Sequence, residues 1–449
     1  MAFLSPPKIT TMEEARSHRK YALIILMLVY AFNFIDRQIL NILQTPIKQD
    51  LNLSDTQLGL LTGFSFTLVY IVVGIAVGKL ADSTNRKTVV TASLAIWSGF
   101  TAISGLAMNY IQLLLYRLGV GVGEAGGSPP AHAMLSDLYE AEKRGRALAI
   151  YSAGIYIGTM TGYMIGGPIS EHLNWRFAFF VVGIPGVLLA ALMWFTIREP
   201  IRGLSGIKPE KSTVTFVGAF ARLWKLKSFR YYSFATGAGT FVTYGVGNWM
   251  VPYLERSHGW QRTEIGLLYG LAAGIFGAIG TIGGGYLADR LGKKDRRWFL
   301  WVPMWGKILG GPFFIFGLLA PNGWLALAGY GLGLICASVY LGPSLAITHH
   351  LVPPSMRAMS SAVLFFILNL LGLGLGPLIV GNVSDALNAN TDLGPDALRW
   401  AMTIAVVAMY PLTILWHLGA QALPKGEIDD NGESATSEVL TEGDPKAQV

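Results

Sequence analysis

Four ionisable residues lie inside segments that are otherwise apolar, and they are the residues best placed to do chemistry. Asp36 and Arg37 are adjacent in one segment, and Arg117 and Glu124 are seven residues apart in another. Seven residues make two helical turns, so Arg117 and Glu124 share one face of a helix. Charged groups in the core of a bilayer cost free energy unless they meet partners or water, so all four are functional candidates.

Buried carboxylates next to arginines are suited to two tasks, the binding and release of a proton and the binding of an anionic cargo. Burial penalises a charged carboxylate and a neighbouring arginine favours it, so Asp36 and Glu124 are candidate proton sites. Guanidinium groups match phosphate or carboxylate oxygens, which makes Arg37 and Arg117 candidate cargo ligands. With both acids ionised the four charges cancel, whereas protonation of either acid leaves positive charge for an anion. An anionic cargo would then bind together with a proton, and a cationic cargo would compete with it.

A purely structural interpretation stays open. Asp36 with Arg117, or Arg37 with Glu124, could form permanent ion pairs that only join two helices. Packing of apolar side chains would join helices at a lower cost than burying four charges. We therefore favour the functional interpretation.

The elements that must position these residues are membrane-spanning helices. The 449 residues are 52% hydrophobic and 14% charged, which is too apolar for a soluble protein of this length. Apolar runs long enough to cross a bilayer recur twelve times, and they predict an all-α membrane protein of twelve transmembrane helices. The predicted spans are 21–44, 58–80, 88–108, 111–136, 146–169, 176–197, 230–254, 264–287, 298–320, 324–348, 358–381 and 398–420.

Internal repetition divides these spans into two halves. The string Gly78-Lys79-Leu80-Ala81-Asp82 recurs 207 residues later as Gly285-Tyr286-Leu287-Ala288-Asp289, and Thr56–Leu61 matches Thr263–Leu268 at the same offset. Such repeats are typical of duplicated transporter bundles. We predict a six-helix bundle over 1–198, a cytoplasmic linker over 199–228, a second six-helix bundle over 229–423 and a disordered cytoplasmic tail over 424–449.

Charge and cysteine content exclude several function classes. Most Lys and Arg residues fall in the termini and in alternate loops, which predicts that both termini are cytoplasmic and explains the basic composition without nucleic acid. The single cysteine, Cys336, excludes intrachain disulfides. The sequence contains no nucleotide-binding loop, nucleophile triad or metal-ligand spacing. We therefore expect neither an enzyme nor a metal cofactor, with H+ as the one possible coupling ion.

A family resemblance follows from the repeated strings. Gly-x-Leu-Ala-Asp followed by basic residues resembles the signature loop of the major facilitator superfamily, and Leu113-x-x-x-Arg117-x-x-x-Gly121-x-Gly123 resembles its fourth-helix motif. Asn33–Arg37 with Gly121–Ala125 resembles the Spinster family, whose eukaryotic members export sphingosine-1-phosphate and lysophospholipids. Short loops suggest a bacterial member in the inner membrane, and a monomer is the default expectation.

The resemblance implies that the first, fourth, seventh and tenth helices of the fold line a central cavity. Glu124 becomes the first choice for the proton site, because the superfamily motif has a small residue there, and Asp36 is the second. Hydroxyl and amide groups recur at four-residue steps in the second half, where helix packing is the alternative role. The predicted cargo ligands are Arg37, Arg117, Asn33, Ser128, Thr240, Tyr244, Asn248, Tyr340 and Ser344.

The repeated loops predict a cytoplasmic latch that joins the two bundles and favours the outward-open state. A basic loop that serves only topology is the alternative. The predicted latch residues are Gly78, Asp82, Arg86, Lys87, Arg146, Asp289 and Arg357. Lys307, some distance into the ninth span, is expected to reach the membrane surface by snorkelling.

Together these features predict a secondary transporter that works by alternating access. Its expected cargo is an amphipathic lipid of the lysophospholipid or sphingoid phosphate class. Transport could be coupled to protons, and the expected partners are membrane lipids. The alternatives are a transporter of a small organic anion or drug, and, from another class, a membrane receptor or scaffold that does not transport.

Overall fold

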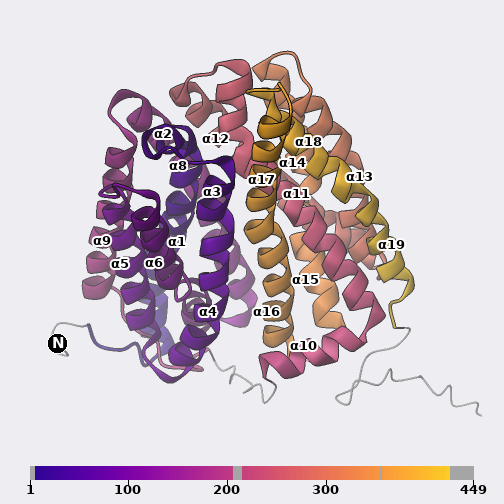
Figure 1. Ribbon diagram of the computed structural model, residues 1–449. Coiled ribbons are helices and arrows are strands. Elements are labelled where there is room, and N and C mark those ends of the chain that lie inside the picture. Colours follow the sequence, from indigo (N-terminus) through magenta and orange to yellow (C-terminus); the bar gives the residue numbers. More distant parts are fainter. Residues whose placement is uncertain (1–5, 206–214, 354–355, 425–449) are drawn as a thin grey trace, which may run out of the picture.

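A computed structural model describes residues 6–205, 215–353 and 356–424, apart from the side chains at positions 75, 78, 79 and 82. Its elements are almost all helical (Figure 1). They are α1 (Met12–Ile42), α2 (Gln44–Leu51), α3 (Asp55–Gly59), η2 (Leu60–Phe64), α4 (Ser65–Ser83), α5 (Arg86–Ser104), α6 (Tyr110–Glu124), α7 (Ser128–Leu138), α8 (Ala141–His172), α9 (Trp175–Thr196), α10 (Phe216–Lys225), α11 (Lys227–His258), α12 (Arg262–Gly292), α13 (Trp298–Leu318), α14 (Gly323–Ala337), α15 (Leu341–His350), α16 (Arg357–Leu368), η4 (Asn369–Gly374), α17 (Leu375–Asn390), α18 (Asp396–Met409), η5 (Tyr410–Thr413) and α19 (Ile414–Gln421).

The helices confirm the predicted all-α membrane architecture. Every one of the twelve apolar ranges falls on helix. Within the described residues, nine helical segments are long and apolar enough to cross a bilayer. The three remaining ranges fall on α5, on the α6–α7 pair and on α11.

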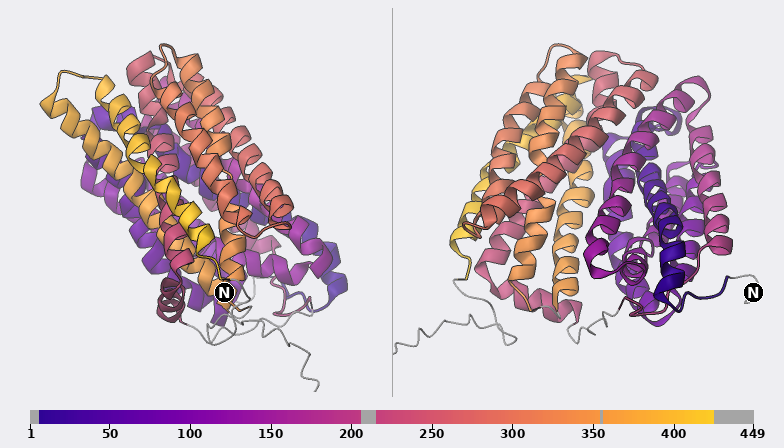
Figure 2. Two further views of the ribbon diagram at one scale, coloured as in Figure 1. Left: turned by 90° about the vertical axis from the view of Figure 1, so that its right-hand side faces the viewer. Right: turned by 180° about the vertical axis from the view of Figure 1, so that it is seen from behind.

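The helices assemble into two bundles (Figures 1 and 2). One contains α1 to α9 and the other α11 to α19, with the short helix α10 beside the second bundle. Within the first bundle α1 packs along α8 and α5 along α9, and within the second α13 packs along α14 and α11 along α19.

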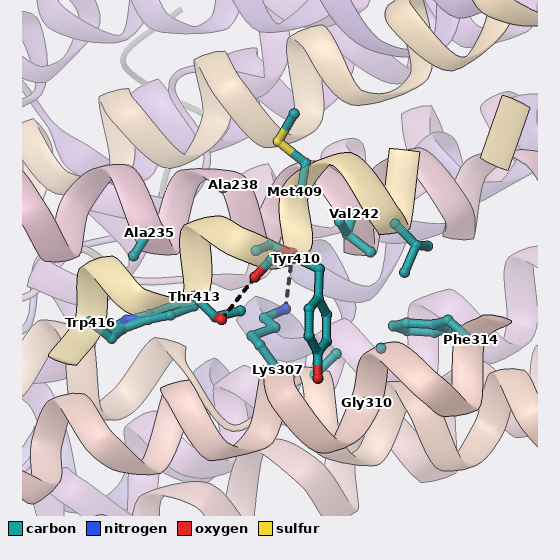
Figure 3. Close-up of a pocket in the computed structure, with 14 residues that line it drawn as sticks. Ala235, Ala238, Val242, Lys307, Gly310, Phe314, Met409, Tyr410, Thr413 and Trp416 are labelled. Carbon is teal, nitrogen blue, oxygen red and sulfur yellow. Dashed lines mark hydrogen bonds between the residues drawn. The ribbon is translucent and has the colours of Figure 1, made fainter. Parts of the chain in front are cut away.

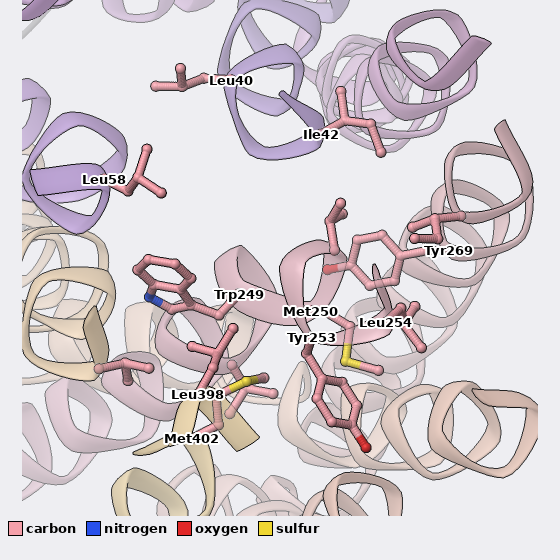
Figure 4. Packing of buried hydrophobic residues seen from close by; sticks show 14 of the residues in the cluster. Leu40, Ile42, Leu58, Trp249, Met250, Tyr253, Leu254, Tyr269, Leu398 and Met402 are labelled. Carbon is pink, nitrogen blue, oxygen red and sulfur yellow. The ribbon is translucent and has the colours of Figure 1, made fainter. Parts of the chain in front are cut away.

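Among the described residues, the largest apolar contact between the two bundles is near one end. One buried cluster combines Leu40 and Leu58 of the first bundle with Trp249, Met250 and many others of the second (Figure 4). A second cluster belongs almost entirely to the first bundle and a third entirely to the second. The shared cluster lies at the end of the molecule opposite the N-terminus, which we call the closed end.

Two equivalent glycines let the bundles touch at the closed end. A Cβ atom on Gly59 would lie 2.5 Å from the carbonyl oxygen of Pro377, and one on Gly266 would lie 2.5 Å from the carbonyl oxygen of Tyr163. Both distances are too short for a side chain, so α3 packs directly on α17 and α12 directly on α8. Gly59 and Gly266 hold the same position in the repeated Thr-x-x-Gly-Leu-Leu string.

Two π-helical turns face each other across the same interface. η2 lies in the second predicted span and η4 in the eleventh, and a Cβ atom on Gly63 of η2 would lie 2.6 Å from the carbonyl oxygen of Leu373 in η4. Turns of this kind are common at functional sites, because they shift the helical register locally. Here they bring backbone from both bundles to the middle of the molecule.

Candidate transport site

Arg37 and Glu124 form an ion pair between α1 and α6. The Nε atom of Arg37 donates to Oε2 of Glu124 at 2.7 Å, and the Glu124 side chain is fully buried. The guanidinium group also lies over the rings of Phe34, Phe66 and Tyr70, at 5.2, 4.8 and 5.4 Å from their centroids. Aromatic faces stabilise a cation in a poorly hydrated place, so the arginine is held by one carboxylate and three rings.

Asp36 and Arg117 are close, but they are not joined side chain to side chain. Asp36 is fully buried and no described group makes a hydrogen bond of good geometry to its carboxylate, although the side chains of Thr101 and Trp97 lie near it. The Nη1 atom of Arg117 lies 3.4 Å from the backbone oxygen of Asp36 instead. The four charged residues therefore lie close together, with Glu124 paired to an arginine side chain and Asp36 not.

A cavity with about 830 Å³ of empty space lies beside this cluster, between the two bundles. Four of the predicted cargo ligands line it: Arg37, Arg117, Tyr244 and Asn248. Its other lining residues include amides, hydroxyls and apolar side chains: Phe34, Gln38, Asn41, Thr62, Phe66, Thr159, Tyr163, Thr243, Gly247, Tyr269, Ala273, Tyr330, Leu334 and Leu373. The cavity is therefore amphipathic, with its charge on the side of the first bundle.

The remaining predicted cargo ligands lie elsewhere. Thr240 and Ser344 are fully buried between helices, where Thr240 donates to the carbonyl oxygen of Gly237, so they occupy helix-packing positions. Ser128 contacts His132 on its own helix. Asn33 is buried next to the Glu124 site, and Tyr340 faces Lys307.

Sequence reasoning missed a group of polar residues that form the wall of the cavity toward the closed end. The hydroxyl of Tyr163 donates to Gln38 at 2.9 Å, and that of Tyr269 donates to the carbonyl oxygen of Gly247 at 2.8 Å. Tyr330 lies 3.1 Å from Tyr269, oxygen to oxygen. The position of Gln38 directly after Arg37 was an available signal, whereas nothing local in the sequence distinguishes these tyrosines from lipid-facing ones.

An ion pair and further charged hydrogen bonds join the two bundles at the closed end. Asp55 is fully buried and accepts two hydrogen bonds from Arg256 of the other bundle, at 2.7 and 2.8 Å. Lys48 donates to the same carboxylate at 2.6 Å. Asp385 of α17 accepts from the backbone N–H groups of Asp55 and Thr56, and so caps the start of α3 from the opposite bundle.

The second contact between the bundles repeats this arrangement. Glu171, near the end of α8, accepts from the backbone N–H of Thr263 at 2.7 Å and caps the start of α12. Arg262 donates to the carbonyl oxygen of Ser170 at 2.8 Å. Thr56 and Thr263 are equivalent positions of the repeated string. The repeat therefore encodes two matching contacts, each with a helix start capped by an acid from the other half.

The predicted latch residues are apart in this conformation. Arg86 and Lys87 are buried within the first bundle, while Arg146, Asp289 and Arg357 are exposed. Two of the predicted latch positions, Gly78 and the side chain of Asp82, are not among those that the structure describes. Among the side chains that the structure describes, the ion pair between the bundles is at the closed end. The latch stays a prediction for a state in which the closed end has opened.

Arg86 has a structural role within the first bundle. It donates to Asp137 at 2.6 Å, to Glu199 at 2.9 Å and to the carbonyl oxygen of Pro200 at 2.7 Å. Removing one member of a buried ionic network leaves uncompensated charge and costs roughly 3–5 kcal/mol.

We expect Arg86→Gln to lower the thermal unfolding temperature of the detergent-solubilised protein clearly. Arg297→Gln, at an exposed pair with Asp295, serves as the control, and equal unfolding temperatures for both variants would contradict this role.

Two pseudo-symmetric helical bundles, joined at one end around an amphipathic central cavity with buried charges, define a membrane transporter. The model of the Major Facilitator Superfamily matches residues 26–377. The chain belongs to this superfamily, as a multi-pass integral membrane protein and not an enzyme.

Relatives of this chain include transporters of several kinds. An "MFS-type efflux pump" of Mycolicibacterium smegmatis is 34% identical over 90% of this chain and 93% of the relative. Human "Protein spinster homolog 1" is 29% identical over 85% of this chain and 76% of the relative. Among solved structures, one is a bacterial homologue of the human lysosomal transporter Spinster, described as inward-facing and unoccupied. It matches this chain with a TM-score of 0.82 and 30% sequence identity, and the match covers 90% of this chain and 97% of the solved chain. The predicted Spinster-like resemblance is confirmed.

Proposed function

We propose that this transporter moves an anionic amphiphile, of the lysophospholipid or sphingoid phosphate class, by alternating access. The observation that carries the proposal is the composition of the central cavity. Arg37 and Arg117 offer guanidinium groups to an acidic head group, and Phe34, Leu334 and Leu373 offer apolar surface to a chain.

The conformation is consistent with the inward-facing half of such a cycle. The bundles are joined through Gly59, Gly266 and the Asp55–Arg256 pair at the closed end. With both termini in the cytoplasm, as the loop charges predict, the closed end is the outer one. Cargo would enter from the cytoplasm or the inner leaflet and leave when the closed end opens, in the direction of export.

Proton coupling would act through the pair of buried acids. In this conformation Glu124 already has a cationic partner, whereas Asp36 forms no ion pair with a described side chain. A buried carboxylate without a cationic partner is better accommodated with a proton bound. We therefore expect Asp36 to take up a proton before Glu124 in this state, which reverses the order expected from the sequence. Protonation of Glu124 in its turn would weaken its hold on Arg37 and free the guanidinium group for the cargo.

A small organic anion or a drug is the second candidate cargo. The 34% identical relative named as an efflux pump favours it, and the aromatic residues around Arg37 would suit a flat aromatic anion as well as a lipid. A receptor that does not transport fits less well, because the two matching contacts of the closed end are what a rocking mechanism needs.

Counterflow in proteoliposomes separates these candidates. The panel contains a labelled lysophospholipid, a sphingoid phosphate, an aromatic organic anion and a neutral sugar, each with and without a pH gradient. We expect the two lipids to exchange, and Asp36→Asn combined with Glu124→Gln to remove the effect of the gradient. Exchange of the aromatic anion without either lipid would overturn the lipid assignment, and an unchanged double variant would overturn the proton sites.

A further inference from the structure

Lys307 is a buried cation in the second bundle and does not itself line the central cavity. Snorkelling to the membrane surface, as the sequence suggested, is wrong, because the side chain points inward and the residue is only 8% exposed. Its Nζ atom donates to the carbonyl oxygen of Gly239 at 2.9 Å and to Oγ1 of Thr243 at 2.8 Å, both on α11. The ring centroid of Tyr340 is 5.0 Å away.

All of these partners are uncharged. The Thr243 hydroxyl donates its own hydrogen to the carbonyl oxygen of Gly239 at 2.9 Å, so toward Lys307 it acts as an acceptor. An ammonium group has three N–H donors, and two are used by α11. Buried ammonium groups in membrane proteins pair with acids or with backbone carbonyls; Lys307 has the carbonyl of Gly239, and none of the described residues that line the adjoining pocket is acidic.

That pocket lies between α11, α13, α18 and the η5–α19 segment (Figure 3), and its enclosed volume is about 30 Å³. Lys307 is the one charged residue in its lining, as described by the structure. Small residues such as Ala238 and Gly310 leave room along the walls, and Phe314 and Trp416 supply apolar surface. The pocket and the central cavity share no lining residue, but Thr243, which accepts from Lys307, lines the central cavity, so the two lie on either side of this contact.

One wall of the pocket borders the lipid-facing surface. The 3-10 turn η5 interrupts the last span at Tyr410–Thr413, and Tyr410 crosses to α13, where its hydroxyl donates to the carbonyl oxygen of Ile308 at 2.9 Å. Leu412 and Ile414, in and directly after this turn, are exposed. A molecule dissolved in the bilayer can therefore approach the pocket past η5.

We propose that this pocket binds a single-chain lipid acid from the bilayer. Its carboxylate enters the enclosed part of the pocket, takes the remaining N–H of Lys307 and supplies a negative charge that the pocket lining lacks, while its chain runs outward past η5 into the bilayer. A charge-assisted hydrogen bond in an apolar place holds the head group, and burial of methylene groups holds the chain. This site is independent of the proposed cargo site.

Photo-crosslinking to the full-length protein in nanodiscs tests the site. The probe is a sixteen-carbon fatty acid with a diazirine on the chain, and its methyl ester is the matched control probe. We expect the acid to label peptides of α13 and of η5–α19, and the ester to label them at least about tenfold less, because the ester cannot pair with the ammonium. Lys307→Met is expected to reduce labelling by the acid similarly, and Lys307→Arg to retain most of it.

Equal labelling by acid and ester would overturn the proposal, and so would labelling that does not depend on Lys307 or that appears only on helices of the central cavity. The acid and ester comparison uses the unaltered chain, so it remains decisive even if Lys307→Met fails to fold. Arg37→Ala is expected to leave this labelling unchanged, since Arg37 lines the other cavity. Loss of lipid transport and loss of this site are therefore distinguishable results.

Discussion

Arg37→Ala is expected to reduce the initial rate of transport at least about thirtyfold. Arg37 holds the buried carboxylate of Glu124 at 2.7 Å and also lines the central cavity. Truncating one partner of a buried, hydrogen-bonded charge pair costs about 2–5 kcal/mol, which corresponds to a thirtyfold effect or more. The measurement is counterflow of labelled cargo in proteoliposomes with matched amounts of inserted protein. Arg297→Ala, at an exposed pair, is the control and should transport normally.

A second variant decides between a cargo ligand and a permanent ion pair. If Arg37 serves only to neutralise Glu124, the double variant Arg37→Ala with Glu124→Gln removes both charges and should recover transport. We expect no recovery, because the cavity would have lost one of its two guanidinium groups. Recovery to near the native rate would establish the structural interpretation and contradict the role of Arg37 in binding. Arg37→Lys should transport weakly, since an ammonium lacks the planar fork and stacks less well on Phe66.

Gly59→Leu and Gly266→Leu are expected to stop the closed end from closing. Even a Cβ atom at either position would lie 2.5 Å from a carbonyl oxygen of the opposite bundle, and backbone cannot move aside as a flexible side chain can. Overpacking typically costs 1–3 kcal/mol, and each 1.4 kcal/mol is a factor of ten in population. The inward-facing state should therefore lose population, and transport should fall about tenfold or more in each variant.

The chain contains matched controls for both glycines. Gly74 belongs to the same span as Gly59, and Gly283 belongs to the same helix as Gly266, but a Cβ atom at either would meet no atom within 4 Å. Leucine at these two positions should leave transport near the native rate. Spin labels at Asp50 and Asp392, both exposed, should report a longer distance across the closed end in Gly59→Leu and Gly266→Leu alone. An unchanged distance would refute this account of closure.

Most of the fold could be predicted, because its determinants are local or repeated. Runs of apolar residues long enough to span a bilayer predicted the twelve helical ranges, and the duplicated strings predicted two equivalent halves. The position of Asp36 with Arg37 and of Arg117 with Glu124 near the middle of their spans predicted a charged cluster. Each of these inferences needs only helical geometry and the cost of charge in a membrane.

Which ion pair forms within that cluster could not be predicted. The sequence offered two pairs, Asp36 with Arg117 and Arg37 with Glu124, and the structure forms the second, while Arg117 reaches only the backbone oxygen of Asp36. The same limit applies to Thr240 and Ser344, whose periodic spacing suited a cavity wall and whose side chains are buried between helices. Which face of a helix meets a cavity depends on its rotation against neighbours that are distant in sequence.

The sequence by itself determined a duplicated, membrane-spanning helical protein with four charges in its core and a family resemblance to transporters, because hydropathy, repeats and motifs are properties of short segments. The tertiary structure alone decided which residues of the first bundle contact which residues of the second. It turned the repeated Thr-x-x-Gly-Leu-Leu string into two equivalent contacts capped by Asp385 and Glu171, and it turned Lys307 from a peripheral lysine into a buried cation beside a pocket. Such contacts join residues far apart in the chain, and only the packed bundles bring them together.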